Sequence, residues 1–263
     1  MQVITSKDNE LIKNIKKLKE KKYRDAMGKY IIEGAKLIEE AINEKANIET
    51  IVVCEDCMKE DTLCRKLVYE IAKENIVYVS SNVFNVITDV SNPQGILAVI
   101  KRAEKNHSIN YNEDVIIVLD NIQDPGNLGT ILRTVDSANL KQIVVSEETA
   151  DVFNSKVVRS TMGAIYRVNV VRSDDLVNDL IKMKENGFDI VVTALDTSDS
   201  VYDINYMKKV IVIGNEANGV SKEIQEIADN KVKIPMLGKT ESLNASVAAG
   251  IMIYEYVKTK IGK

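Results

Sequence analysis

The hydrophobic positions of the chain form strand-like and helix-like segments that alternate in two successive series. In the first series, helical spacing predicts helices at 30–45 and 63–75, and apolar runs predict strands at 49–55, 76–80 and 95–102. In the second series the predicted strands are 115–121, 142–146, 166–171, 189–196, 210–216 and 231–236, and the predicted helices are 127–138, 154–162, 174–186, 221–229 and 243–259. Several of these strands are continuous apolar runs, which are typical of parallel strands covered by helices on both faces. The chain is therefore predicted to be α/β, with a small N-terminal α/β domain and a C-terminal α/β domain built on a parallel sheet.

A polar segment separates the two series. KRAEKNHSINYNED, residues 101–114, has little periodicity and is typical of a linker. We assign residues 1–106 to the N-terminal domain, 107–114 to the linker and 115–263 to the C-terminal domain.

The composition is that of an ordinary globular protein, and it argues against a membrane, an export signal or a metal centre. No run approaches 18 apolar residues, and the N-terminus carries charges where a signal peptide needs its apolar core, so the expected location is the cytoplasm. The cysteines Cys54, Cys57 and Cys64 raise the alternatives of a metal or redox site and of incidental thiols. We favour incidental thiols, because the single histidine, His107, is distant and the acids within CEDC disfavour a thiolate.

Basic residues are concentrated near the N-terminus, although the net charge of the chain is −4. LIKNIKKLKEKKYRDAMGKY, residues 11–30, holds eight Lys or Arg and two acids. Leu11, Ile15 and Leu18 repeat at helical spacing, which predicts one apolar stripe on a basic helix. Three interpretations remain open for its charged face: ordinary solvation, contact with RNA phosphates, or contact with a membrane surface.

Three segments share one pattern, in which an apolar strand ends, glycine, proline and small polar residues follow, and a helix begins. They are VLDNIQDPGNLGTILRT (118–134), VIGNEANGVS (212–221) and IPMLGKTESLNAS (234–246). Ligands of α/β proteins bind at the carboxyl ends of the strands, so the three segments are expected at one edge of the sheet. Taken singly, each also fits an ordinary turn or a capped helix. Together they collect Asn121, Asn127, Arg133, Asn215, Glu216, Ser242 and Asn244 into a polar, glycine-lined site.

These segments resemble, in order and spacing, the three motifs of the TrmH/SpoU branch of the SPOUT RNA methyltransferases. VVRSTMGAIYRVNV, residues 157–170, resembles a further family segment between the first and second motifs. The N-terminal half is similar to the L30e-like substrate-binding domain of many rRNA methyltransferases, through residues 24–34 and 91–100. A nucleotide-dependent enzyme of another kind is disfavoured, because the chain lacks a Walker lysine motif and a complete dinucleotide fingerprint.

The resemblance implies S-adenosylmethionine as methyl donor, a ribose 2′-hydroxyl of RNA as acceptor, a deep trefoil knot and a homodimer, with no metal. The N-terminal domain favours 23S rRNA over tRNA as the substrate, by analogy of architecture. The alternative to an enzyme is a non-catalytic RNA-binding or ribosome-assembly protein of the same fold. The cofactor-binding residues that the resemblance implies are Gly214, Ile234, Met236, Ser242, Leu243, Ala194 and Leu195.

The catalytic residues implied by the resemblance are Asn127, Arg133, Glu216 and Asn244. A guanidinium is normally only a hydrogen-bond donor, so Arg133 is expected to clamp a phosphate or the developing alkoxide, and the base lies elsewhere. Glu216 either orients Arg133 or Asn127 or accepts the proton itself, and we favour orientation. Asn127 and Asn244 offer both donors and acceptors for a ribose hydroxyl, and Ser242 either caps the last helix or touches the cofactor.

Overall fold

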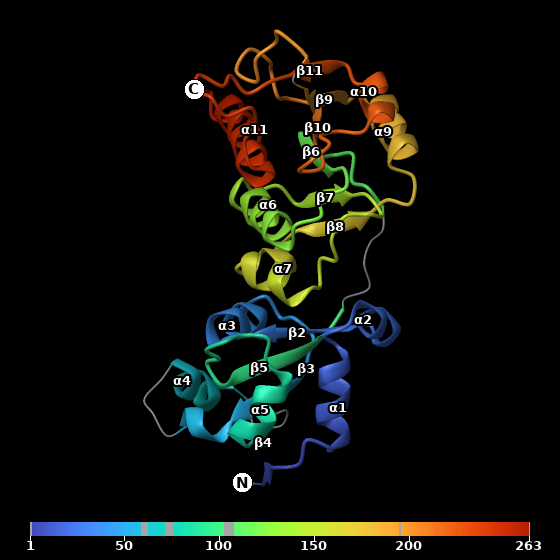
Figure 1. The fold of residues 1–263 in the computed structure, drawn as a ribbon. Coiled ribbons are helices and arrows are strands. Elements are labelled where there is room, and N and C mark those ends of the chain that lie inside the picture. Colours follow the sequence, from blue (N-terminus) through green and yellow to red (C-terminus); the bar gives the residue numbers. More distant parts are fainter. Residues whose placement is uncertain (1, 59–62, 72–75, 103–107, 195, 263) are drawn as a thin grey trace. The chain divides into compact units, whose positions relative to one another are not determined.

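The computed structural model describes residues 2–58, 63–71, 76–102, 108–194 and 196–262 (Figure 1). The described chain forms two compact units that do not follow chain order. The first unit comprises Met1–Glu104 and Asp151–Tyr166, and the second comprises Lys105–Ala150 and Arg167–Lys263. A segment from the middle of the C-terminal half thus packs with the N-terminal half.

The first unit is built on a five-stranded mixed sheet. Its strands lie in the order β1 (Val3–Ile4), β4 (Ile76–Val79), β3 (Ile48–Cys54), β5 (Ile96–Lys101) and β2 (Lys29–Glu33). β5 is antiparallel to both of its neighbours, whereas β3, β4 and β1 are mutually parallel.

Both faces of this sheet are covered, because its strand residues are apolar on both sides. One face packs against α3 (Ala35–Asn43), α4 (Leu63–Glu70) and residues 151–166, which contribute Val158 and Phe153 to the core. The other face packs against α1 (Glu10–Lys17) and α5 (Ser81–Ile87). The short elements α2 (Lys21–Met27) and η1 (Glu55–Met58) complete this part of the fold.

The helix predicted at 30–45 is wrong in its first part. Residues 29–33 form β2, which pairs antiparallel with β5 over its whole length, and only α3 is helical. Gly34, with φ +104°, turns the chain between the two elements, and Gln94 accepts a hydrogen bond from the backbone of Ala35 at 2.9 Å. A short apolar run fits a strand or a helix equally well, so the pairing with β5 decided this segment.

The second unit is built on a six-stranded sheet in which every pair of neighbouring strands is parallel, as predicted. The strands lie in the order β11 (Asn230–Val232), β9 (Asp189–Thr193), β10 (Lys209–Ile213), β6 (Val115–Leu119), β7 (Gln142–Val145) and β8 (Asn169–Arg172). The central strands β6 and β10 are almost wholly buried.

Helices cover both faces of this sheet (Figure 1). α6 (Pro125–Ser137) and α11 (Ala245–Lys260) lie side by side on one face. α9 (Leu176–Glu185) and α10 (Lys222–Ile227) cover the other and bury Leu180, Met183 and Ile224 against the sheet valines. The three-layer α/β architecture expected from continuous apolar strands is confirmed.

Several strand boundaries differ from those predicted. β9 and β10 end at Thr193 and Ile213, three residues before their predicted ends. Residues 164–167 form the short helix α8 (Ala164–Arg167), which follows α7 (Ser155–Ser160), and the strand begins only at Asn169. The cause is that Ile165 and Tyr166 pack into the core of the first unit. The last strand ends at Val232 instead of Met236, since only residues 230–232 pair with β9 and Pro235 has no N–H to donate.

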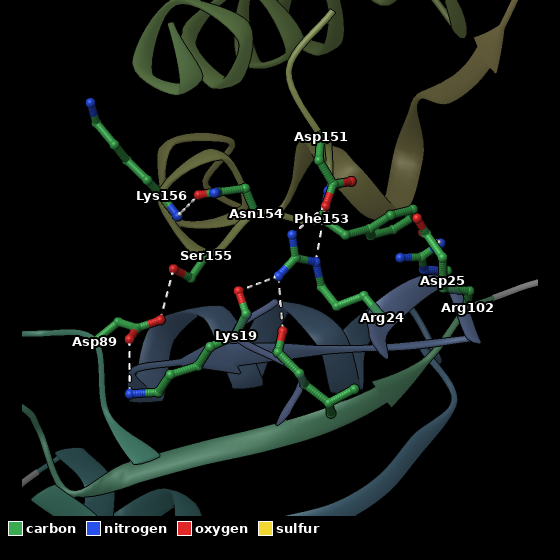
Figure 2. Close-up of polar contacts among 11 residues, drawn as sticks. Lys19, Arg24, Asp25, Asp89, Arg102, Asp151, Phe153, Asn154, Ser155 and Lys156 are labelled. Carbon is green, nitrogen blue, oxygen red and sulfur yellow. Dashed lines mark hydrogen bonds and ion pairs between the residues drawn. The ribbon is translucent and has the colours of Figure 1, made fainter. Parts of the chain in front are cut away.

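Arg24 is the main polar anchor of the first unit, as Figure 2 shows. Its side chain is buried, and Nε and Nη2 donate to Asp151 Oδ2 at 2.9 and 2.5 Å. Nη1 donates to the backbone oxygens of Leu18 and Lys19 at 2.9 and 2.7 Å. Nε, Nη1 and Nη2 of the guanidinium therefore each meet an acceptor, which is what a buried arginine requires.

The basic segment 11–30 consequently combines structural and surface charges. Helix α1 ends at Lys17, and its buried stripe is Ile12, Ile15 and Leu18. Lys19 pairs with Asp89 at 2.9 Å, so it also serves the fold. Lys16, Lys17 and Lys21 remain exposed.

The described ranges contain no helix with the length and apolarity needed to cross a bilayer. They also contain no cluster of three or more potential metal-binding side chains. No disulfide joins Cys54, Cys57 and Cys64, and Cys54 and Cys64 are buried. His107 lies outside the described residues.

We expect Asp151→Ala to destabilise the protein by about 3–5 kcal/mol, because it leaves the Arg24 guanidinium buried without its carboxylate. The measurement is the free energy of unfolding in urea. The matched control is Asp8→Ala, which removes the partner of Lys13 in an ion pair exposed by 54% and 88%, and should cost less than about 1 kcal/mol. Equal losses for the two variants would contradict a structural role for the Arg24–Asp151 pair.

Candidate functional site

The candidate site lies at the carboxyl edge of the second sheet, where the loops after β6, β9 and β10 emerge. Because all strands of this sheet are parallel, these loops necessarily leave from the same edge. The segment that follows β11 and leads to α11 joins them there and contributes to the same cavity.

The loop after β6 is held in a strained turn. Asn121 has φ +59°, a conformation that asparagine tolerates better than most residues. Its backbone N–H donates to Ser146 Oγ at 2.9 Å, and its backbone oxygen accepts from Asn215 Nδ2 at 2.8 Å. The next helix, α6, starts with Asp124 as N-cap, which accepts from the backbone of Asn127 at 2.8 Å, and Pro125 occupies the first turn.

The loop after β10 turns back on itself within six residues. Asn215 and Gly219 exchange backbone hydrogen bonds of 3.0 and 2.9 Å. A Cβ atom on Gly214 would lie 2.2 Å from backbone atoms of Gly219 and Val220, so no other residue fits at this position. The glycine of the second motif is therefore required by the closeness of the loop to its own strand.

The Glu216 carboxylate joins this loop to the loop after β6. It accepts from the backbone N–H groups of Gln123 and Asp124 at 3.2 and 3.1 Å, and from Asn127 Nδ2 at 3.0 Å. Asn127 Oδ1 in turn accepts from Asn244 Nδ2 at 2.9 Å, which brings in the third segment. Three distant parts of the sequence are thus connected by one chain of hydrogen bonds.

The pKa of Glu216 lies below its ordinary value of 4.5. Partial burial acts to raise this pKa, but the hydrogen bonds from Asn127 and from backbone N–H groups, including those of Gln123 and Asp124, favour the carboxylate and outweigh burial. Glu216 is therefore an anion at neutral pH and a weak proton acceptor.

Asn244 is the N-cap of α11, a role that the sequence analysis considered for Ser242. Its Oδ1 accepts from the backbone N–H and the hydroxyl of Ser246 at 2.9 and 2.6 Å. Ser242 instead faces the cavity of the site. Residue type does not separate the two, since serine and asparagine are both strong N-cap residues.

A cavity of about 550 Å³ lies among these loops. It is lined by six of the seven residues expected to bind the cofactor: Ala194, Gly214, Ile234, Met236, Ser242 and Leu243. Leu195, the seventh, lies outside the described residues. Carboxylates of Asp196, Glu216 and Glu241 and the ammonium group of Lys233 complete the lining. The cavity therefore combines apolar walls with an excess of negative charge.

The structure brings three of the four expected catalytic residues into contact. Asn127, Glu216 and Asn244 form the hydrogen-bonded chain described above. Arg133 is two turns further along α6, is exposed, and makes no side-chain hydrogen bond or ion pair within the described part of the chain. Glu216 is therefore bound to Asn127 and not to Arg133, which distinguishes the two orientation roles proposed for it.

The sequence analysis missed several residues of the site. Asp124 was detectable, because Asp-Pro at the start of a predicted helix is an N-cap signal. Gln123 contributes through its backbone, which carries no signal in the sequence. Glu241 and Lys233 lie in segments without periodicity, and only the fold places them at the cavity.

A parallel α/β sheet with a cavity among its carboxyl-end loops is typical of a protein that binds a small ligand at this edge. The chain belongs to the SpoU rRNA methylase family, whose model matches residues 114–254. Membership of this family makes it an RNA methyltransferase. Residues 9–98 match the MRM3-like substrate binding domain.

Related sequences and solved structures align with nearly the whole chain. The 23S rRNA (guanosine(2553)-2′-O)-methyltransferase RlmP of Bacillus subtilis is 33% identical over 97% of this chain and 98% of its own length. An RNA 2′-O ribose methyltransferase of known structure superposes with a TM-score of 0.86 at 27% identity, covering 99% of this chain and 100% of its own. The AdoMet-bound rRNA methyltransferase of Sinorhizobium meliloti superposes with a TM-score of 0.83 at 30% identity, covering 99% and 98%.

We expect Glu216→Gln to destabilise the protein at pH 7 by less than about 1 kcal/mol, since the carboxylate is substantially exposed. The folded-state pKa is depressed, so the stabilisation by the carboxylate is present above the unfolded value, near 4.5, and disappears as the pH falls through the folded value. The difference in unfolding free energy between wild type and Glu216→Gln should therefore shrink on acidification below about pH 4.5. A difference that grows on acidification would contradict this assignment.

Proposed function

We propose that this protein transfers a methyl group from S-adenosylmethionine to a ribose 2′-hydroxyl of 23S rRNA in the cytoplasm. The observation that carries the proposal is the cavity of about 550 Å³ at the carboxyl edge of the sheet, which the second and third motif segments and the end of β9 line. The full-length similarity to the Bacillus subtilis rRNA enzyme supports the choice of substrate.

The residues of the cavity fit this methyl donor, which combines a heteroaromatic ring, a sulfonium cation and an amino-acid group. Ile213, Ile234 and Leu243 offer apolar surface for the ring. Asp196, Glu216 and Glu241 supply negative charge in a site for a cationic molecule. The ammonium group of Lys233 can pair with the carboxylate in the amino-acid group of the donor.

When bound, the donor supplies an electrophilic methyl carbon, and the 2′-oxygen of the ribose displaces the sulfide leaving group from it. The sulfonium charge is consumed as the oxygen loses its proton, so the protein must align the acceptor and assist loss of that proton. Arg133 is exposed, and its side chain has no hydrogen-bond or ion-pair partner among the described residues, which suits a donor reserved for an RNA phosphate or for the developing alkoxide.

Glu216 serves as a positioning residue in this proposal. Its lowered pKa makes it a poor base at neutral pH, and its three acceptor contacts fix Asn127 and the start of α6, the helix that carries Arg133. Asn127 and Asn244 each keep a second amide N–H for a ribose hydroxyl, the role that the family resemblance implies.

We also propose the trefoil knot and the division of labour implied by the resemblance. Residues 1–106 bind the RNA, 107–114 are a linker and 115–263 carry out the transfer, while 151–166 of the last range also pack with the RNA-binding domain. The separate matches at 9–98 and 114–254 support this division.

A homodimer, also implied by the resemblance, is supported by the surface of α11. Val247, Tyr254 and Ile261 follow one another at intervals of seven residues and are exposed by 49%, 51% and 60%. The opposite side of the helix is buried through Met252 and Ile253. When a helix is apolar on two opposite sides, both sides are expected to pack against protein. We propose that a second copy of the chain packs against the exposed side.

We expect Arg133→Ala to reduce ribose methylation of unmodified total RNA by at least about 100-fold, because it removes a charge that acts on the transition state. Calorimetry should show unchanged affinity for S-adenosylmethionine. Lys141→Ala, an exposed cation of the same unit, is the control and should retain full activity. Retained turnover by Arg133→Ala would remove its catalytic role, and no methyl incorporation into any RNA by the wild type would favour the non-catalytic RNA-binding protein.

We expect Val247→Asp to convert the dimer to a monomer at micromolar concentration, because it would bury an unpaired carboxylate in the interface. Analytical ultracentrifugation measures the change. Ile181→Asp replaces an apolar residue of α9 that is exposed by 41%, and should leave the dimer intact. A wild-type monomer would reject the proposed interface.

A further inference from the structure

The first unit contains a second cavity, of about 300 Å³, which the proposed methyl transfer does not use. It lies against the start of α3 and the turn before β5, and α7 closes it with Arg159 and the residue after its C-cap, Met162. The two stretches are distant in sequence, but both belong to the first unit. The cavity therefore forms only when residues 151–166 pack onto the N-terminal sheet.

Arg159 points to the kind of ligand. Its Nη1 atom is enclosed by protein yet has no hydrogen-bond partner among the described residues. A charged donor that loses water without gaining an acceptor is costly, and such groups normally mark a site for a ligand or water. Lys36 adds a second, exposed cation at the rim of the cavity. An anionic group such as a phosphate satisfies both.

The other walls fit a nucleobase. Leu37, Val90 and Met162 provide apolar surface on which the face of a base can lie. The exposed amide side chains of Asn92 and Gln94 offer donors and acceptors for its edge. The volume of the cavity, about 300 Å³, lies at the lower end of the range for sites that enclose a small ligand.

Two carboxylates, Glu33 and Glu40, also line the cavity and balance the charges of Arg159 and Lys36. Glu33 is engaged by the hydroxyl of Thr88 and by the backbone N–H of Asp89. Glu40 lies beside Gly163, where a Cβ atom would approach its Oε2 to 2.9 Å. A carboxylate at such a wall is an acceptor for the exocyclic amine of a base.

The position of Arg159 is fixed by contacts at the start of its segment. Asp151 pairs with buried Arg24, and Ser155 Oγ donates to Asp89 Oδ2 at 3.0 Å, while Asp89 also pairs with Lys19 (Figure 2). Val158, next to Arg159, is fully buried in the core of the unit. The guanidinium is therefore presented by a rigid element, as a preformed binding site requires.

We propose that this cavity binds one unpaired nucleotide of the RNA substrate. Its phosphate binds Arg159 and Lys36, its base packs on Leu37 and Met162, and the edge of the base meets Asn92 and Gln94. This inference depends on the proposed function in one respect, namely that RNA is the substrate. It assigns recognition of an unstacked nucleotide to the first unit, at a site separate from methyl transfer.

The test compares Arg159→Gln and Lys36→Gln with wild type in methylation of unmodified 23S rRNA. Each variant should raise KM for RNA about tenfold and leave kcat and the affinity for S-adenosylmethionine unchanged. The salt dependence of RNA binding should fall by about one ion per variant. Lys66→Gln, which removes an exposed cation of α4 in the same unit, should behave as wild type.

A second measurement separates this inference from the proposed function. Adenosine, cytidine, guanosine and uridine 5′-monophosphates are titrated into the full-length protein by NMR, and at least one should bind to wild type and not to Arg159→Gln. That result supports the cavity even if no RNA is methylated. The inference is overturned if KM is unchanged in both variants. It is also overturned if Arg159→Gln still binds a nucleotide that the wild type binds. Finally, it is overturned if the wild type methylates no RNA and binds none of the four nucleotides. Unfolding in urea verifies that each variant is folded.

Discussion

The hydrogen bonds accepted by the Glu216 carboxylate are the constraint on which the candidate active site depends. They connect the loop after β10 to the start of α6, and through Asn127 to the N-cap of α11. Each segment alone is a short loop with few apolar contacts, and such loops are among the least stable parts of a fold. A single anion on one loop that accepts hydrogen bonds from three donors of the other therefore gives the site a defined geometry, and its lowered pKa keeps that anion charged at neutral pH.

A different polar contact organises the first unit. Arg24 and Asp151 lie 127 positions apart, and their pairing accompanies the burial of Val158 and Tyr166 against the N-terminal sheet. The substrate-binding unit is consequently completed by a segment from the half of the sequence that carries the transferase motifs. Residues 151–166, which lie between the first and second motifs in the sequence, therefore belong structurally to the first unit.

Predictability followed the strength of the local signal. β6 and β10 are apolar runs that end just before the turns at Asn121 and Gly214, and they were predicted correctly as parallel and buried. Residues 29–33 are apolar too, but a strand and a helix compete there, and pairing with β5 decided the outcome. Arg24 resembled its basic neighbours in the sequence, because burial of one side chain among many exposed ones leaves no trace in composition. Ser242 and Asn244 were interchangeable as caps until the backbone placed Asn244 at the helix start.

The sequence by itself determined the α/β class, the parallel second sheet and the three motif segments whose residues meet at the candidate active site. It could do so because hydrophobic periodicity and glycine or N-cap signals act over a few residues. Only the tertiary structure decided that Glu216 binds Asn127 and not Arg133, that Asp151–Tyr166 completes the first unit, and that Arg159 faces a second cavity. These features depend on contacts between residues far apart in the chain, whose free energy exists only once the surrounding core has excluded water from them.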